Sequence, residues 1–248
     1  MSIKNRVVLI TGSGSGIGKQ TALRMAEQGA KVVINDVIPE KVDETVAEYK
    51  KMGLDVIGKT ADISDETAVN NMFKETVDAF GGLDILVNNA GMERSGPLRK
   101  LTEEDWNITL DIDLKGAFLC CRAAHNYMVP NKHGRIINIA SRAWLGGAGQ
   151  TPYAAAKSGM VGITRSLALE LGRNGITVNC IAPGLIHTPQ WDSLPEKNKK
   201  FLLSKQPMPT LGEVDDIAHA VLYFSDDDNG FTTGQVLYVC AGRSLFSG

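Results

Sequence analysis

A continuous apolar run near the start of the chain leads directly into a glycine-rich turn, and this combination constrains the fold most. Val7–Ile10 is apolar at every position, as in a strand buried on both faces of a parallel sheet. The turn Thr11–Gly18 follows, and then a periodic segment places Ala22, Leu23 and Ala26 on one face. Strand, glycine turn and helix in this order predict a phosphate cradle, because a helix start offers free N–H groups and a positive dipole end.

The spacing of the glycines qualifies this prediction. The strict G-x-G-x-x-G pattern fails at Ile17, whereas T-G-x-x-x-G-x-G fits Thr11–Gly18. A glycine-rich turn on its own is also compatible with a flexible loop. The strand before it and the strand after it favour the nucleotide-binding interpretation.

The next apolar run, Lys31–Asp36, ends in an acidic residue. In dinucleotide-binding folds an acid near this offset binds the adenosine ribose hydroxyls, and its charge repels a 2′-phosphate. Ser13–Gly18 contains no Arg or Lys, and Val37 follows Asp36. We therefore predict NAD rather than NADP as the cofactor. The alternative is that Asp36 only ends a strand.

Apolar runs and helical patterns alternate along the rest of the chain, which predicts an α/β fold. We expect a Rossmann-like, doubly wound parallel sheet of about seven strands with helices on both faces, in a single NAD(P)-binding domain over residues 1–248. Strands are expected near 6–11, 31–36, 55–60, 85–88, 134–140, 177–181 and 236–239, and helices near 17–28, 39–51, 65–80, 102–128, 152–171 and 213–224. In such sheets ligands bind at the carboxyl ends of the strands.

Composition excludes several classes of function. A formal net charge of −2 gives no electrostatic case for binding nucleic acid or an acidic membrane surface. No apolar stretch reaches the roughly 18 residues that a membrane helix requires. The four cysteines lack metal-type or disulfide-framework spacing, so we expect reduced thiols, no metal site and a cytoplasmic location.

Tyr153 and Lys157 lie four positions apart in a predicted helix, so both can point into one site. A phenol has a pKa of about 10, and a nearby lysine favours the phenolate. Such a pair suits proton transfer to or from an alcohol or carbonyl oxygen. Taken alone, a Tyr and a Lys at this spacing are also compatible with a surface pair. Ser141, twelve positions before Tyr153, is the third candidate.

Taken together and in order, these motifs resemble the short-chain dehydrogenase/reductase family, of the type with about 250 residues in one domain. The matching positions are Thr11–Gly18, Asp36, Asp62, Asn88–Gly91, Ser141, Tyr153, Lys157, Pro183-Gly184 and Thr188. The resemblance implies an NAD-dependent oxidoreductase (an alcohol dehydrogenase or ketoreductase) that interconverts a secondary alcohol and a ketone by hydride transfer. Ser141 then binds the substrate oxygen, Tyr153 exchanges the proton, and Lys157 holds the nicotinamide ribose.

The resemblance also implies where the nucleotide lies. The glycine turn lines the pyrophosphate, Asp36 holds the adenosine ribose, and Asp62 and Ile63 lie near the adenine. The implied cofactor-binding residues are Gly12, Ser15, Gly16, Ile17, Gly18, Asp36, Asp62, Ile63, Asn89, Ala90, Gly91, Tyr153, Lys157, Pro183, Gly184, Ile186 and Thr188.

Two positions depart from the family pattern. Asp113 stands where many members carry an Asn that helps to hold a proton-relaying water, so Asp113 is a candidate catalytic residue whose charge changes the pKa values around it. Ser141 lies twelve rather than thirteen positions before Tyr153, and thirteen positions would fall on Ala140. We prefer Ser141, because it follows the predicted strand directly, with a one-residue deletion in the loop 142–152.

The substrate is less sharply indicated. Expected substrate contacts are Glu93, Arg142, Trp144 and Trp191, and residues 187–211, with a short helix near 196–204, are expected to form a lid. The tryptophans favour a cyclic or aromatic alcohol slightly over a sugar or polyol. Alternatives are an NADPH-dependent ketoreductase and a non-catalytic dinucleotide-binding sensor. By family expectation the protein forms a homotetramer through its fourth and fifth helices.

Overall fold

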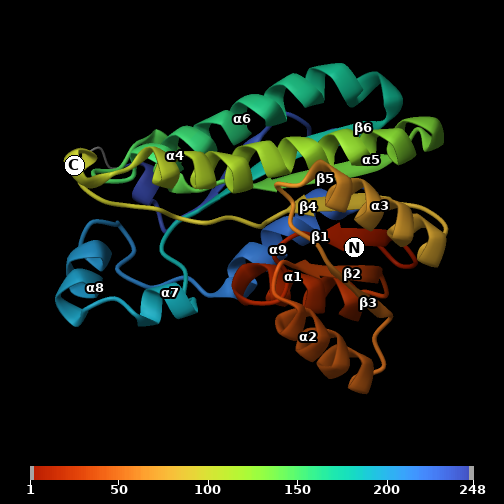
Figure 1. Ribbon diagram of the computed structural model, residues 1–248, viewed down its shortest axis with the longest axis horizontal. Helices are drawn as coiled ribbons and strands as arrows, with labels where there is room; N and C mark the ends of the chain where they lie inside the picture. Colours follow the sequence, from red (N-terminus) through yellow and green to blue (C-terminus); the bar gives the residue numbers. More distant parts are fainter. Residues whose placement is uncertain (1–2, 246–248) are drawn as a thin grey trace.

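The computed structural model describes residues 3–245, and a seven-stranded parallel sheet forms its centre (Figure 1). The strand order is β3-β2-β1-β4-β5-β6-β7, so the chain reverses its winding direction between β1 and β4. This order is that of a doubly wound nucleotide-binding fold, and it confirms the predicted fold class. The strands are β1 (Val7–Ile10), β2 (Lys31–Asp36), β3 (Val56–Thr60), β4 (Ile85–Asn88), β5 (Gly134–Ile139), β6 (Ile176–Pro183) and β7 (Val236–Val239).

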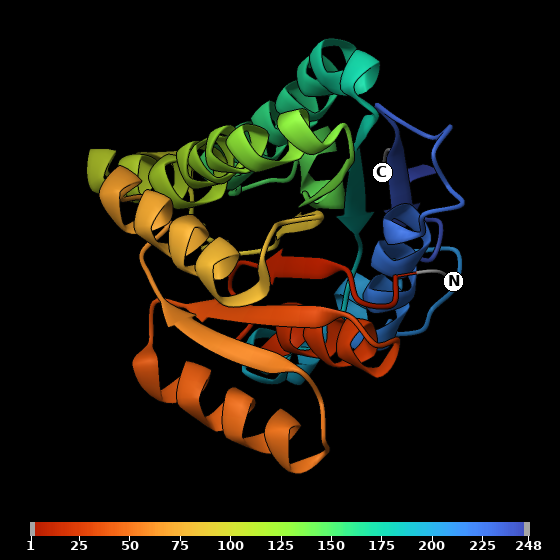
Figure 2. The same cartoon turned by 90° about the vertical axis from the view of Figure 1, so that its right-hand side faces the viewer.

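Helices cover both faces of the sheet (Figure 2). Residues of α1, α2 and α9 pack on one face, and residues of α3, α5 and α6 pack on the other. The helices are α1 (Gly16–Glu27), α2 (Pro39–Lys51), α3 (Glu66–Phe80), α4 (Glu103–Leu110), α5 (Ala117–Asn131), α6 (Thr151–Leu171), α7 (Pro189–Asp192), α8 (Glu196–Leu203) and α9 (Val214–Ser225).

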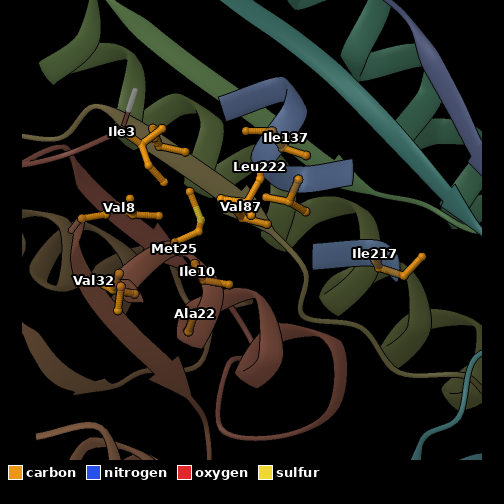
Figure 3. Packing of buried hydrophobic residues seen from close by; sticks show 14 of the residues in the cluster. Ile3, Val8, Ile10, Ala22, Met25, Val32, Val87, Ile137, Ile217 and Leu222 are labelled. Carbon is orange, nitrogen blue, oxygen red and sulfur yellow. The ribbon is translucent and has the colours of Figure 1, made fainter. Parts of the chain in front are cut away.

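Side-chain alternation along the strands fills the two cores. Val8 and Ile10 of β1 pack with Met25 of α1 in the cluster drawn in Figure 3, whereas Leu9 packs in the cluster on the opposite face. Successive strand residues point to opposite faces, so a run such as Val7–Ile10 must be apolar throughout to serve both cores. The continuous apolar runs in the sequence follow from this arrangement.

The predicted helix over 102–128 is wrong in one respect, because it is not a single α-helix. The helix α4 ends at Leu110, the π-helical turn η2 (Asp111–Gly116) follows, and α5 then continues to Asn131. Gly116 explains part of the local geometry, since a Cβ at that position would lie 2.7 Å from a side-chain atom of Ile63. π-Helical turns inside α-helices are frequent at functional sites.

Two short helices stand apart from the layers around the sheet. In Figure 1, α7 and α8 lie together at the left, within the segment predicted to form a lid. The helix α8 confirms the short helix expected near 196–204, and α7 is an addition, capped by Thr188, whose Oγ1 accepts a hydrogen bond from Trp191 N. This segment follows β6 and therefore begins at the carboxyl edge of the sheet.

Candidate active site

The turn between β1 and α1 is held tightly against the start of the segment after β4. Gly12 and Gly16 have φ values of 61° and 57°, in the left-handed region that favours glycine. Asn89 Nδ2 donates hydrogen bonds to the carbonyl oxygens of Thr11 and Gly12, at 2.9 and 3.0 Å. A Cβ on Gly18 would collide with this amide and with the Gly12 carbonyl. The conformation of the turn is thus fixed by its own glycines and by the hydrogen bonds from Asn89.

The geometry of this turn fits the pyrophosphate of a dinucleotide. Ser15 is the N-cap of α1, but its side chain makes no capping hydrogen bond, so it leaves the first N–H groups of the helix to another acceptor. A Cβ on Gly16 would meet no atom within 4 Å, so the space beside the helix start is open. Open space in front of uncapped N–H groups is what an anionic phosphate requires.

Asp36 and Lys41 both approach the same glycine of the turn. A Cβ on Gly14 would lie 2.8 Å from Asp36 Oδ2 and 2.7 Å from Lys41 Cβ. Asp36 is the last residue of β2, and its Oδ1 also accepts a hydrogen bond from Ile38 N. Lys41, in the first turn of α2, was missed at the sequence level, because only the residues of the glycine turn and Val37 were considered as phosphate partners.

Ser141, Tyr153 and Lys157 line one cavity of about 1240 Å³. Ser141 follows the end of β5, and its Oγ accepts a hydrogen bond from Ala143 N and lies near enough to the Tyr153 phenol to lower its pKa, while Tyr153 and Lys157 project from α6. Lys157 Nζ lies 5.4 Å from the centre of the Tyr153 ring and donates a hydrogen bond to the Ile139 carbonyl oxygen. The hydroxyl at 141, rather than Ala140, therefore stands beside the phenol.

The π-helical turn places the buried Asp113 against Lys157, behind the wall of this cavity. Its Oδ2 lies 3.0 Å from Lys157 Nζ, and its Oδ1 accepts a hydrogen bond from Met92 N at 2.6 Å. Gly91 leaves room for this contact, because a Cβ there would lie 3.0 Å from Asp113 Oδ2 and 3.2 Å from Lys157 Nζ. An aspartate at position 113, where the sequence departs from the family pattern, thus forms a buried ion pair with Lys157.

The electrostatics differ from the simple sequence-level expectation for Tyr153. Burial raises the pKa of Tyr153 and Lys157 lowers it, but the charges of Asp113 and Glu93 raise it again, so that the net direction is upward. Burial lowers the pKa of Lys157, but the charges of Asp113 and Tyr153 outweigh burial, and the pKa is raised overall. Lys157 thus lowers the pKa of Tyr153 as expected, but in the protein alone burial and the two carboxylates outweigh it.

Many of the other residues predicted to bind the cofactor or the substrate also line this cavity. Those that line it are Ile17, Asn89, Gly91, Glu93, Arg142, Pro183, Gly184, Ile186, Thr188 and Trp191. Trp144 instead stacks on Tyr238, with ring centres 6.3 Å apart, and is not part of the lining. Asp62 and Ile63 do not line this cavity. Asp62 accepts hydrogen bonds from Ser64 and lines a second pocket with Asp111 and Ile112, whereas Ile63 packs in the core.

Several cavity residues were not predicted from the sequence. Gln150 donates a hydrogen bond to Glu93 Oε1 at 2.7 Å, and Lys205 and Arg243 contribute two cations to the wall. Gln150 is the N-cap residue of α6, three positions before Tyr153, whereas Lys205 and Arg243 lie in a loop and a short helix far from the motifs; no local pattern marks any of the three. Among residues 3–245, no group of three or more His, Cys, Asp or Glu side chains is arranged to hold a metal ion. In the same part of the chain no helix is long and apolar enough to cross a membrane.

Comparisons with known proteins agree with this geometry. A family model described as enoyl-(acyl carrier protein) reductase matches residues 12–244. The chain is 68% identical over 248 residues, which is 100% of both chains, to a Thauera aromatica protein named (2S)-[(R)-hydroxy(phenyl)methyl]succinyl-CoA dehydrogenase subunit BbsD. It is 36% identical to the 3-oxoacyl-[acyl-carrier-protein] reductase FabG of Thermotoga maritima, covering 98% of this chain and 99% of that one. The crystal structure of levodione reductase superposes with a TM-score of 0.94 at 35% identity, over 98% of this chain and 99% of the other.

Proposed function

The chain belongs to the short-chain dehydrogenase/reductase family and is an oxidoreductase, and from this premise we propose that it interconverts a secondary alcohol and a ketone with NAD. One observation carries the proposal: Ser141, Tyr153 and Lys157 line a single cavity that also contains Ile17 of the glycine turn. The cofactor-binding set predicted from the sequence, from Gly12 to Thr188, is proposed with it.

The proposed substrate is a thioester of [hydroxy(phenyl)methyl]succinate, whose benzylic alcohol is oxidised to the phenyl ketone. The support is the 68% identity to a protein named for that reaction. The cavity wall suits an aromatic ring, since Leu145, Trp191, Leu194 and Leu202 contribute apolar surface to it. This is the aromatic-alcohol prediction from the sequence, and it is preferred over a sugar or polyol.

In the proposed mechanism the chain's own residues orient the alcohol and move its proton. Ser141 donates a hydrogen bond to the substrate oxygen, and the phenolate form of Tyr153 removes the hydroxyl proton as the carbonyl double bond forms. Lys157 stabilises the phenolate and would hold the nicotinamide ribose, while Asp113 holds Lys157 in place. The oxidised nicotinamide, when bound, accepts the hydride from the carbinol carbon.

We extend the proposal to the surroundings of the site. Residues 187–211 form the lid over the substrate within one domain. Trp191, which is 8% exposed, lines the cavity together with other lid residues such as Leu194 and Leu202. The enzyme works in the cytoplasm on a small molecule. It is an oligomer in which exposed apolar side chains of α5 and α6, such as Phe118 and Leu169, are covered. A homotetramer is our expectation, and a mixed assembly is the alternative, because the Thauera relative is named as a subunit.

One observation favours a second candidate, an NADPH-dependent ketoreductase. Lys41 lies beside Asp36 at the glycine turn, where a cation could bind a 2′-phosphate. The identity to the 3-oxoacyl-[acyl-carrier-protein] reductase of Thermotoga is in keeping with it. We prefer NAD because the carboxylate of Asp36 stands in the same place.

The proposal is tested by following reduced-nicotinamide absorbance with NAD and with NADP. The substrates are 2-[hydroxy(phenyl)methyl]succinyl-CoA, 1-phenylethanol and a polyol, and Tyr153→Phe is the control for enzyme-dependent turnover. We expect NAD-dependent oxidation of the thioester far above the other two. Turnover only with NADPH and a ketone supports the second candidate, and NAD binding without turnover of any substrate supports a sensor.

A further inference from the structure

Two arginines from distant parts of the chain lie on the wall of the catalytic cavity. Arg142 begins the short helix η3 (Arg142–Leu145) directly after Ser141, and Arg243 begins η5 (Arg243–Leu245). These two short helices pack against each other. Over residues 3–245 the arginines that form ion pairs are Arg6, Arg24 and Arg122, so neither cavity arginine has a carboxylate partner in that part of the chain.

The hydrogen-bonding capacity of both guanidinium groups is only partly used. Nη1 of Arg142 donates to the Gly146 carbonyl oxygen, and Nη1 of Arg243 donates to the Leu202 carbonyl oxygen, each at 3.3 Å. Arg142 Nε is buried without a hydrogen-bond partner. Since a guanidinium carries five N–H donors in a planar fork, most of these donors have no partner within residues 3–245 and remain available to a ligand.

Their placement also makes the two charges repel each other. Burial lowers the pKa of Arg243, and the charge of Arg142 lowers it further. Two cations held together in a partly buried wall are stabilised by an anion between them. A carboxylate fits best, because its two oxygens match the guanidinium fork.

We propose that Arg142 and Arg243 form a subsite for the free carboxylate of the substrate. This inference rests on the proposed function, which supplies an alcohol that carries a carboxylate. Arg142 is the neighbour of Ser141, so the subsite adjoins the place where the substrate hydroxyl binds. In a [hydroxy(phenyl)methyl]succinyl thioester the free carboxylate is only a few bonds from the carbinol carbon, which fits this adjacency.

The other charged residues of the wall do not occupy this role. Glu93 is the acidic residue of the lining, and its Oε1 accepts hydrogen bonds from Ser95 and Gln150. Lys157 is paired with Asp113. Lys205, on the exposed side of the wall after α8, adds a third cation that attracts the anion toward the subsite.

The test compares Arg142→Met and Arg243→Met with Arg173→Met, an exposed arginine outside the cavity, as the matched control. Each is assayed on the free-acid thioester and on its methyl ester, both as CoA and as N-acetylcysteamine thioesters. We expect each cavity variant to lose about 10- to 100-fold in kcat/KM on the free acids, mainly through KM, and little on the methyl esters. Unchanged NAD affinity, measured by calorimetry, verifies that the variants fold.

Several outcomes overturn the inference while leaving the proposed function intact. Equal losses on acid and ester exclude a carboxylate subsite, and losses confined to the CoA thioesters assign the arginines to the CoA phosphates. If the wild type oxidises none of these alcohols, the proposed function fails. The subsite is then decided by titrating benzylsuccinate into wild type and both variants with NAD present, where unweakened binding in the variants rejects it.

Discussion

Asp113 Oδ2 lies 3.0 Å from Lys157 Nζ, and the two side chains are 0% and 3% exposed. The lysine that we propose to assist Tyr153 is therefore paired with a buried carboxylate. The negative charge of Asp113 raises the pKa of Tyr153 as well as that of Lys157. Asp113 therefore offsets part of the effect by which Lys157 favours the phenolate form of Tyr153 that alcohol oxidation requires.

We predict that Asp113→Asn moves the pH–rate profile of alcohol oxidation to lower pH. Oxidation needs the phenolate, so activity rises as the pH rises through the pKa of Tyr153. Since Asp113 raises that pKa, its neutral replacement lowers it and moves the rising limb to lower pH. The measurement is kcat/KM against pH for the variant and the wild type.

The matched control for this shift is Asp111→Asn. Asp111 lies in the same π-helical turn, but it is half-exposed and pairs with Lys115 at 3.6 Å. The control should leave the profile in place. A profile of Asp113→Asn that superposes on the wild type contradicts a role for this carboxylate in setting the proton transfer.

Tyr153→Phe should abolish most of the turnover without weakening the binding of NAD. The substitution removes the hydroxyl that exchanges the proton, and such groups typically contribute on the order of 100- to 10,000-fold to the rate. The ring, which lies 5.4 Å from Lys157 Nζ, is kept, so the wall of the cavity should persist. Single-turnover kinetics and calorimetry with NAD measure the two effects separately, and near-normal turnover would exclude Tyr153 as the acid–base group.

Asp36→Ala should narrow the preference for NAD over NADP. Asp36 Oδ2 and Lys41 Cβ both lie close to Gly14, so removing the carboxylate leaves a lysine at this turn without the acid that repels a 2′-phosphate. We expect the ratio of kcat/KM values for the two cofactors to fall by about tenfold or more. Asp43→Ala, which changes an exposed acid of the same helix as Lys41, is the control. An unchanged ratio in Asp36→Ala means that selection lies elsewhere.

The elements of the fold were predictable because their signals are local. The run Lys31–Asp36 and the helix Pro39–Lys51 have the predicted bounds, since apolar periodicity and a proline at a helix start depend only on neighbouring residues. The break at Asp111–Gly116 was not predictable from periodicity, because a π turn keeps a helix-like pattern. Gly116, the last residue of this turn, lies close to Ile63, and such a contact between residues far apart in sequence leaves no trace in the periodicity.

The candidate site likewise contains residues that a local pattern predicts and residues that only the folded structure brings together. Tyr153 and Lys157 share a helix, so their spacing alone predicts a common site. Lys41 beside Gly14 and Arg243 beside Arg142 are pairs from separate segments, and only tertiary packing brings them together. Trp144 was assigned to the substrate from its position near Ser141, but its ring is directed to Tyr238.

A second polar cluster, distant in sequence from the catalytic residues, surrounds His133. Its Nε2 lies 3.5 Å from Asp227 Oδ1 and 4.0 Å from Asp84 Oδ1, while Arg6 bridges the same two carboxylates. Burial lowers the pKa of His133, and the charges of Arg6 and Arg135 lower it further. The charges of Asp227 and Asp84 raise it, but the net direction is downward. The folded protein therefore holds this histidine neutral at a pH where the unfolded chain has already taken up a proton.

The sign of the resulting pH dependence follows from that difference. Because the pKa of His133 is lower in the folded protein than in the unfolded chain, its contribution to stability is fully present above the unfolded-state pKa of about 6.5. This contribution is lost as the pH falls toward the folded-state pKa. His133→Gln should therefore lose less stability than the wild type between about pH 7.5 and about pH 5.5. Urea unfolding at both pH values measures the two free energies, and His125→Gln, an exposed histidine of α5, is the control. If wild type and His133→Gln lose equal stability over this range, His133 does not contribute to the acid sensitivity of the fold.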